Sequence, residues 1–426
     1  MSTIRFLIVL SLGLAGCTRA PAPAPASQPA PVKASAPVVI EVTPWTLPVD
    51  RGAAQPDLVP APDGTVLLSW IEPLARGHAL RFSRYRQGAW SAPLTIAKGD
   101  DWFVNWADTP HVQATPDGAL WAHWLRRSAA APYAYDVVLS RSGDGGARWS
   151  SPMAVNNDGT PTEHGFVSLW PASRTGIGVA WLDGRNTEAD ADGAHAGHGG
   201  GPMALRSAMF DAQLQRSGET EVDASTCDCC QTDVALTPRG AVLAYRDRTP
   251  AEIRDIAVTR LEGGRWTPPR MVHADGWRMP GCPVNGPSIA ADGDRVLVGW
   301  YTEAGGLPTV RVATSDDAGD RFGAPRELVR GAEVLGRVAV AWSNGAGWIS
   351  WLQEAGNVQT LWVARMPVDP AQPHVAARVA TLTGRGRGTG VPQLVASGTQ
   401  LHVAWTDVEA GAPRLRGATV RLAASP

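Results

Sequence analysis

The chain has 426 residues, and its 38 Lys and Arg against 40 Asp and Glu give a formal net charge of −2. That balance gives no electrostatic case for a nucleic-acid partner, because such proteins concentrate positive charge on one face. Beyond residue 37 no segment has the length and apolar character of a membrane span, and none shows helical periodicity.

The first 16 residues have the features of a lipoprotein signal peptide. Arg5 precedes an apolar run, residues 6–14, which is too short to cross a bilayer of roughly 30 Å as a helix. The letters LAGC that end at Cys17 resemble the bacterial lipobox, which implies that Cys17 is lipidated and becomes the mature N-terminus. Its acyl chains would anchor the protein to a membrane without spanning it. By the same resemblance, Thr18 favours the outer membrane, with the protein facing the periplasm or the cell surface.

Residues 17–37 are rich in Pro and Ala and almost uncharged, so we expect an extended tether after Cys17. Residues 38–426 show no further change of composition and are predicted to form one domain. A compartment beyond the inner membrane permits disulfides, and the four cysteines that remain after Cys17 form an even number.

One phrase recurs seven times in this domain: an apolar run that ends in an aromatic residue, followed by polar or charged residues. VLLSWIE at 66–72 and VLVGWYTE at 296–303 are two copies, and successive aromatic residues lie 51 to 64 positions apart. Each copy is flanked by other short strand-like segments and by turns such as PDG. Four short strands per repeat predict the blades of a β-propeller. The aromatic anchors are Trp70, Trp124, Trp181, Tyr245, Trp300, Trp351 and Trp405.

Two tight turns carry a more specific motif. SGDGGARW at 142–149 and SDDAGDRF at 315–322 both fit Ser-x-Asp-x-Gly-x-x-Trp/Phe. In such a turn, Ser and Asp bond the backbone, Gly adopts a conformation closed to other residues, and the aromatic ring packs between sheets. The motif resembles the Asp box of the sialidase-like BNR-repeat propellers, and the repeat pattern extends the resemblance over residues 38–426. It implies an all-β propeller, but the box is structural in that family and says little about function.

The two ends of the domain indicate how the ring closes. The seventh repeat stops after RLRGATVRL and lacks its last strand, whereas VVIEVTPWTL at 38–47 precedes the first repeat and has no partner. We expect this N-terminal segment to supply the missing strand of the last blade. Seven blades are therefore favoured, with six, the number found in sialidases, as the alternative.

The order of strands also predicts which loops share a face. The loop after each anchor strand and the lead-in segment before each blade's first strand should lie on one face, with the Asp boxes on the other. Unusual polar residues are concentrated in these loops and lead-ins, and Asp101, Asn105, His164 and Asp255 are among them. The expected ligand-binding residues at the channel mouth are Trp102, Trp106, Asp183, Arg185, Asp247, Glu252 and Asn285.

Arginine forks, tryptophan faces and paired carboxylates suit an anionic or sugar-like ligand. Sialidases use an arginine cluster, a Tyr/Glu pair and an Asp acid, and if this protein is an enzyme the resemblance implies a glycoside hydrolase like the exo-sialidases. The Arg-Ile-Pro motif of those enzymes is absent. The alternative is that YRDRTPAEIRD at 245–255 is an ion-paired network that braces two blades. The residues to which the resemblance assigns catalytic roles are Asp108, Arg246, Arg248, Arg254, Tyr301 and Glu303.

The four cysteines of the domain occupy two neighbouring lead-ins. Cys227, Cys229 and Cys230 precede the fourth blade and Cys282 precedes the fifth, so Cys282 is expected to reach the other three. Disulfides between blades, a thiolate site for Cu or Zn, and a redox-active pair all remain open. The Asp- and His-containing loop at 183–202 is a weaker candidate for metal binding. Without a helix, the spacing of its Asp and His residues does not place their side chains on one face.

The favoured function is binding or hydrolysis of a glycan or other anionic ligand on the face of the lead-ins. The alternative is a non-enzymatic lipoprotein propeller that acts as an assembly scaffold, with a protein partner on that face, or as a soft-metal-handling module.

Overall fold

The computed structural model describes residues 39–187, 201–369 and 372–423. The chain divides into two units, Met1–Pro37 and Val38–Pro426, and only the second is described. The signal peptide, Cys17, the tether and residues 188–200 of the loop at 183–202, with its histidines, therefore lie outside the described residues. Within those residues, no helix has both the length and the apolar character that a membrane crossing requires.

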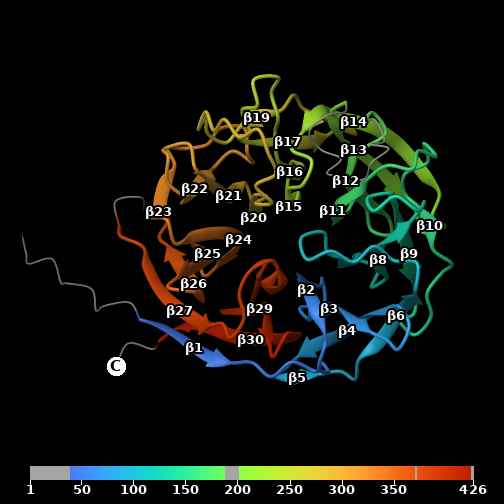
Figure 1. Ribbon diagram of the computed structural model, residues 1–426, viewed down its shortest axis with the longest axis horizontal. Helices are drawn as coiled ribbons and strands as arrows, with labels where there is room; N and C mark the ends of the chain where they lie inside the picture. The colour runs from blue at the N-terminus through green and yellow to red at the C-terminus, as the bar shows by residue number, and fades with distance from the viewer. Residues whose placement is uncertain (1–38, 188–200, 370–371, 424–426) are drawn as a thin grey trace, which may run out of the picture. The chain divides into compact units, whose positions relative to one another are not determined.

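Seven four- or five-stranded antiparallel sheets form a ring in the described part of the chain (Figure 1). The first three blades are β2 (Ala54–Pro60), β3 (Val66–Pro73), β4 (His78–Arg86), β5 (Ala89–Trp90) and β6 (Leu94–Gly99); β7 (Val112–Ala114), β8 (Leu120–Arg127), β9 (Tyr135–Ser142) and β10 (Met153–Ala154); and β11 (His164–Pro171), β12 (Ile177–Asp183), β13 (Met203–Phe210) and β14 (Arg216–Thr226). The next three are β15 (Asp233–Thr237), β16 (Gly240–Arg246), β17 (Ile256–Glu262), β18 (Arg265–Trp266) and β19 (Arg270–Met271); β20 (Ser288–Asp292), β21 (Arg295–Thr302), β22 (Thr309–Ser315) and β23 (Arg326–Arg330); and β24 (Val334–Ser343), β25 (Ala346–Ala355), β26 (Val358–Met366) and β27 (Val375–Thr381). The seventh is β28 (Gln393–Ser397), β29 (Gln400–Glu409), β30 (Ala412–Leu422) and β1 (Ile40–Pro44), preceded by the 3₁₀ helix η1 (Arg387–Thr389).

The ring closes through the N-terminal strand. β1 runs antiparallel to β30, with Ile40 opposite Leu422 and Pro44 opposite Ala418, and the two lie side by side in Figure 1. The predictions of seven blades and of closure by the N-terminal segment are both confirmed, and the six-bladed alternative is excluded.

The seven aromatic anchors lie on the second strand of each blade, and all seven are buried. Their apolar neighbours on the same strands form clusters that join consecutive blades. One such cluster unites Leu67 and Phe82 of the first blade with Leu120 and Trp124 of the second. The periodic phrase therefore marks the blade interior, where hydrophobic burial between neighbouring sheets stabilises the ring.

Both Asp boxes form the turns that their sequences predict. In the first, Ser142 Oγ donates to Asp144 Oδ1 at 2.9 Å and accepts the N–H of Gly146 at 2.9 Å. Gly146 has φ of 95°, and a Cβ there would lie 2.3 Å from Phe82, so only glycine fits. Trp149 then packs edge-on to Phe82 with ring centroids 6.2 Å apart, which fastens the second blade to the first.

The innermost strand of each blade is the first strand of its repeat. These strands, β2, β7, β11, β15, β20, β24 and β28, surround a central cavity of about 630 Å³. Side chains at the start of these strands accept backbone N–H groups from the next blade. Asp57 accepts Val112 N at 3.1 Å, Asp108 accepts Phe166 N at 2.8 Å, and Asn285 accepts Arg337 N at 2.7 Å. These buried bonds fix each blade relative to its neighbour, because an unpaired polar group at such a position would be costly.

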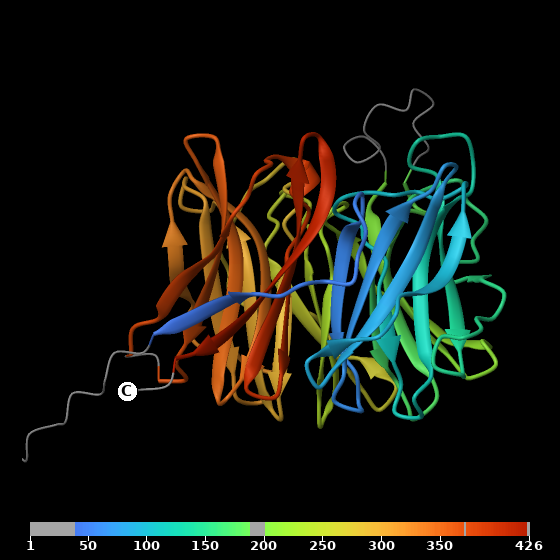
Figure 2. The ribbon, with the colours of Figure 1, turned by 90° about the horizontal axis from the view of Figure 1, so that it is seen from below.

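The lead-in segments meet at one end of this cavity, as the strand order predicts. Gln231, before the fourth blade, donates from Nε2 to Ala107 O of the second at 2.8 Å and accepts from Gly286 N of the fifth at 3.1 Å. The guanidinium carbon of Arg337, in the first half of β24, lies 4.7 Å from the ring centroid of Trp106. We call this end the upper face. Figure 2 shows the strands running between it and the opposite face.

Candidate functional site

Arg246 is a fully enclosed brace between the fourth and fifth blades. Its guanidinium donates to three backbone carbonyls, those of Arg254 (2.6 Å), Asn285 (2.7 and 3.1 Å) and Tyr301 (2.8 Å), and its carbon lies 4.9 Å from the Trp277 ring centroid. Only 2% of Arg246 is exposed. Its donors therefore face the protein rather than the mouth.

Arg248 and Arg254 belong to a chain of ion pairs. Arg248 Nη1 lies 3.1 Å from Asp228 and Arg248 Nη2 lies 2.8 Å from Glu252, whose other oxygen is 2.8 Å from Arg254 Nη2. Arg254 is buried and also donates to Cys227 Sγ at 3.2 Å. The three arginines consequently do not converge on a shared open space, and the geometry matches the ion-paired network considered from the sequence.

Tyr301 and Glu303 are hydrogen-bonded to each other at the end of β21, with the Tyr301 hydroxyl donating to Glu303. Tyr301 is buried beside Trp277, whereas Glu303 is exposed. Burial, followed by the hydrogen bond with Glu303, raises the pKa of Tyr301. The Asp108 carboxylate forms hydrogen bonds elsewhere, with the N–H of Phe166 and the hydroxyl of Tyr135.

A second tyrosine joins two carboxyls between the second and third blades. The hydroxyl of Tyr135, the first residue of β9, lies 2.6 Å from Glu163 Oε1 and 3.4 Å from Asp108 Oδ2. Tyr135 and Asp108 are buried, while Glu163 is partly exposed. Phe103 stacks on Tyr135 at 4.0 Å, and the exposed Tyr133 lies 6.0 Å beyond Phe103, so a short aromatic platform adjoins the carboxyls.

The environment of this group favours protonated carboxyls. Burial raises the pKa of Asp108 to about 7, although the N–H of Phe166 opposes the rise. Burial also raises the pKa of Glu163 to about 8; the Tyr135 hydroxyl opposes the rise, and the charges of Asp108 and Asp228 add to it. At neutral pH Glu163 therefore holds a proton at the surface, which is the state that a general acid requires.

The predicted residues Asp183 and Arg185 are paired with each other. Arg185 Nε and Nη2 donate to the two oxygens of Asp183 at 2.7 and 2.8 Å, and Arg185 also contacts Asp158 and Glu219. The buried His164 lies 3.1 Å from Asp158 and 3.8 Å from Asp183. Asp158, His164 and Asp183 are close enough to bind a metal ion, but the guanidinium of Arg185 already neutralises two of them.

The remaining predicted ligand-binding residues contact other parts of the protein. Trp102 is buried against Trp124, and Trp106 lies under Arg337. The amide of Asn285 donates to Pro283 O and Leu335 O. Burial, followed by the charge of Asp223, raises the pKa of Asp247 to about 6.

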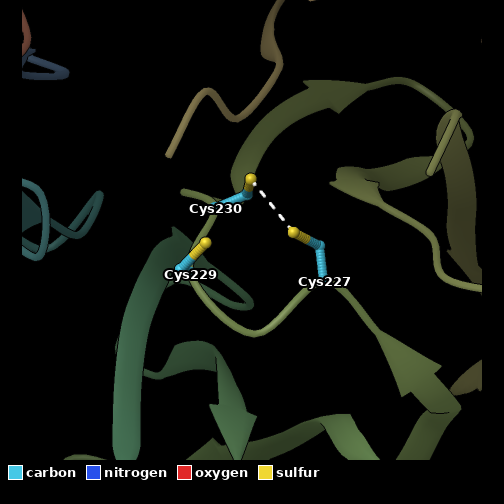
Figure 3. A group of neighbouring side chains, drawn as sticks. All are labelled: Cys227, Cys229 and Cys230. Atoms are coloured by element: carbon cyan, nitrogen blue, oxygen red, sulfur yellow. Dashed lines mark hydrogen bonds between the residues drawn. The ribbon is translucent and has the colours of Figure 1, made fainter. Parts of the chain in front are cut away.

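The cysteines of the fourth lead-in form a compact group (Figure 3). The sulfurs of Cys227, Cys229 and Cys230 all lie within 4.8 Å of one another, and those of Cys227 and Cys230 are 3.3 Å apart. Cys227 and Cys230 are buried, Cys229 is partly exposed, and Cys282 is exposed. All four are free thiols in the described part of the chain, and a hydrogen bond with Cys282 is among the causes that raise the pKa of Cys229.

Electrostatic effects differ among these thiols. Burial would raise the pKa of Cys227, but hydrogen bonds from Cys229 and Cys230 and the charge of Arg254 lower it well below the usual value. Burial raises the pKa of Cys230. A single thiolate at Cys227, stabilised by Arg254, is the arrangement that this environment favours.

Sequence reasoning missed Tyr135, Glu163 and Asp228. Glu163 and Asp228 stand in lead-in segments that the strand order assigns to the upper face. Their position in these segments was the signal that could have identified them. Tyr135 gave none, because an aromatic residue at the start of a strand is more simply interpreted as core.

These observations define a seven-bladed β-propeller with a polar site on its upper face. No family model and no curated protein matches the sequence. The solved structures that resemble it include the endosialidase of phage phi92, with a TM-score of 0.50 and 9% identity over 91% of this chain and 70% of that one. An α-L-arabinofuranosidase of Fusarium graminearum gives a TM-score of 0.47 and 14% identity over 90% and 97% of the two chains. The polysaccharide lyase Uly1 gives 0.47 and 9% over 89% and 91%. At these identities the likeness is one of fold.

Proposed function

We propose that this protein binds a glycan on its upper face, above the second to fourth blades, and cleaves it with Glu163 as the proton donor. The observation that carries the proposal is the hydroxyl of Tyr135 held between Glu163 and Asp108, with Glu163 alone reaching the surface. In hydrolysis the Glu163 carboxyl gives its proton to the leaving oxygen as the glycosidic bond breaks, and a water molecule adds to the sugar carbon and returns a proton to the solvent.

The surroundings of Glu163 suit a sugar. Tyr133 is 36% exposed and presents an aromatic face of the kind on which sugar rings pack. Arg248 and Glu252, which are partly exposed in the lead-in and loop region of the fourth blade, offer donors and acceptors to hydroxyl or carboxylate groups. Asp108 is buried and acts as a positioning residue through Tyr135. The solved structures of similar fold include proteins named for action on glycans, but the proposal does not rest on them, because one fold serves many functions.

The test is turnover of a panel of aryl glycosides and polysaccharides by the purified chain. We expect Glu163→Gln to lower kcat at least about 100-fold, the typical contribution of general acid catalysis. Because the acid is active only when protonated, kcat should fall as the pH rises through about 8. Glu327→Gln is the matched control. Glu327 lies on β23, the outer strand of the fifth blade, and pairs with Arg311 of β22, away from the proposed site.

Two results would overturn the proposal. One is a natively folded protein that neither binds nor cleaves any member of the panel. The other is loss of turnover in Glu303→Gln with full turnover in Glu163→Gln, which would move the site to the Tyr301 pair.

The setting that we propose for this activity is the bacterial outer membrane, facing the periplasm or the cell surface, with Cys17 as the lipidated anchor. The support is the apolar run and lipobox resemblance in the sequence. Metabolic labelling with an alkyne fatty acid should mark the wild-type chain and leave Cys17→Ala unmarked.

A further inference from the structure

We propose that Cys227, Cys229 and Cys230 form a three-sulfur site for a soft monovalent metal ion, Cu(I). Their sulfurs lie within 4.8 Å of one another, in one lead-in segment of the upper face (Figure 3). A metal bonded to thiolates at about 2.3 Å holds its sulfurs roughly 4 Å apart. Small side-chain rotations would therefore bring the three donors to bonding distance. This site is independent of Glu163 and of glycan binding.

The donor set selects the kind of ion. The group contains only sulfur, and thiolates prefer Cu(I) and Zn(II) over hard cations. Structural zinc sites are almost always tetrahedral with four protein ligands. Here the three sulfurs form the group, while Cys282 is exposed beside it. The three sulfurs that lie within 4.8 Å of one another suit Cu(I), which is stable with trigonal thiolate coordination.

A buried cationic side chain contacts one sulfur of the group. Three thiolates with one Cu(I) carry a net charge of −2, which is costly to bury without partners. Arg254, whose side chain is 0% exposed, donates to Cys227 Sγ at 3.2 Å. Arg248 forms an ion pair with Asp228, which also lies 4.0 Å from Arg254. Arg254 also pairs with Glu252, so what it gives the complex is a fixed cationic hydrogen-bond donor to one thiolate.

The segment that carries the sulfurs is also held in place. Cys227 N donates to Arg246 O at 2.9 Å, and Thr226 Oγ1 donates to Met203 O at 3.2 Å. At the other end, Gln231 is fastened to Ala107 and Gly286. Both ends of the loop are thus fixed by neighbouring strands and lead-ins, so the three donors are ordered before a metal arrives and binding costs little conformational entropy.

The competing outcome for the same sulfurs is a disulfide between Cys227 and Cys230, whose sulfurs are 3.3 Å apart. The experiment therefore begins with the full chain, reduced and kept free of oxygen. It is titrated with Cu(I) against bathocuproine disulfonate, the bound copper is counted by elemental analysis, and the sulfur donors are counted by X-ray absorption. We expect one Cu(I) per chain with three sulfurs.

Variants separate the donors from their surroundings. Cys229→Ser removes the most accessible of the three sulfurs and should weaken Cu(I) binding by more than the roughly 100-fold typical for loss of an outer-shell partner. Ser225→Ala alters the same segment without touching a sulfur and should bind Cu(I) as the wild type does. Melting temperatures of both variants check that the propeller remains folded.

Three results would overturn the proposal. The first is a reduced, folded chain that takes up no stoichiometric Cu(I). The second is equal loss of binding in Ser225→Ala and Cys229→Ser. The third is a copper shell of four sulfurs that falls to three in Cys282→Ser, which would replace the three-sulfur site by a four-sulfur one.

Discussion

Replacement of Arg246 by methionine tests whether this arginine is part of the fold or of the ligand site. Methionine keeps the apolar stem against Trp277 and removes the guanidinium. The carbonyls of Arg254, Asn285 and Tyr301 then lose a buried donor, and each such group left unpaired costs about 1–3 kcal/mol. Removal of the buried charge offsets part of that cost. We therefore expect the free energy of unfolding to fall by about 3–5 kcal/mol.

The assay is urea denaturation followed by tryptophan fluorescence, for which the chain offers 18 tryptophans. Arg278→Met is the matched control, because Arg278 lies in the neighbouring loop and is exposed. If Arg246→Met lowers the free energy of unfolding by less than about 1 kcal/mol, as a surface substitution does, then Arg246 does not hold the fourth and fifth blades together. If ligand binding were lost at the same time, Arg246 would return to the role that the sialidase resemblance gave it.

Three further predictions concern the scaffold. Ser315→Ala removes the hydroxyl that bonds Asp317 and the N–H of Gly319, so the melting temperature should fall, with about 1–2 kcal/mol of stability lost; no change would mean that the box is not a structural turn. Burial would lower the pKa of His111, but the charge and hydrogen bond of Asp57 raise it overall, so this pair stabilises the fold fully below the unfolded pKa of about 6.5 and ceases to do so as the pH rises through the folded pKa. The melting-temperature gap between wild type and Asp57→Asn should therefore shrink as the pH rises above about 6.5, and a constant gap would exclude the linkage. Deletion of residues 38–47 uncovers β30 and should give aggregates on gel filtration, whereas a stable monomer would show that closure is dispensable.

Much of the fold could be predicted from the sequence because it rests on local signals. An aromatic residue at the end of an apolar run marks the second strand of a blade, and the Asp box specifies its own turn. Even the closing strand was recognisable, since the last repeat lacks a strand and the segment before the first has no partner. These features repeat along the chain, and each repeat supports the interpretation of the others.

The site was harder to predict because composition does not reveal partners. Arg246 and Arg248 stand two residues apart, yet one is enclosed by carbonyls and the other is paired with carboxylates. Tyr135 and Glu163 meet only because adjacent blades bring them together. The approach of Cys282 to the other cysteines followed from the repeat, but the bonding state of their sulfurs depends on oxidation and on metal supply, which no sequence pattern encodes.

The pairing of β1 with β30 also sets the order in which this protein can be completed. The first strand of the domain to leave the ribosome has its partner in the last strand of the domain. Until β30 has been synthesised, one edge of the nascent propeller stays open, and unpaired edges are where chains pair wrongly or are cut by proteases. A chain that ends before β30 therefore cannot close its ring, and its open edge leaves it a substrate for degradation.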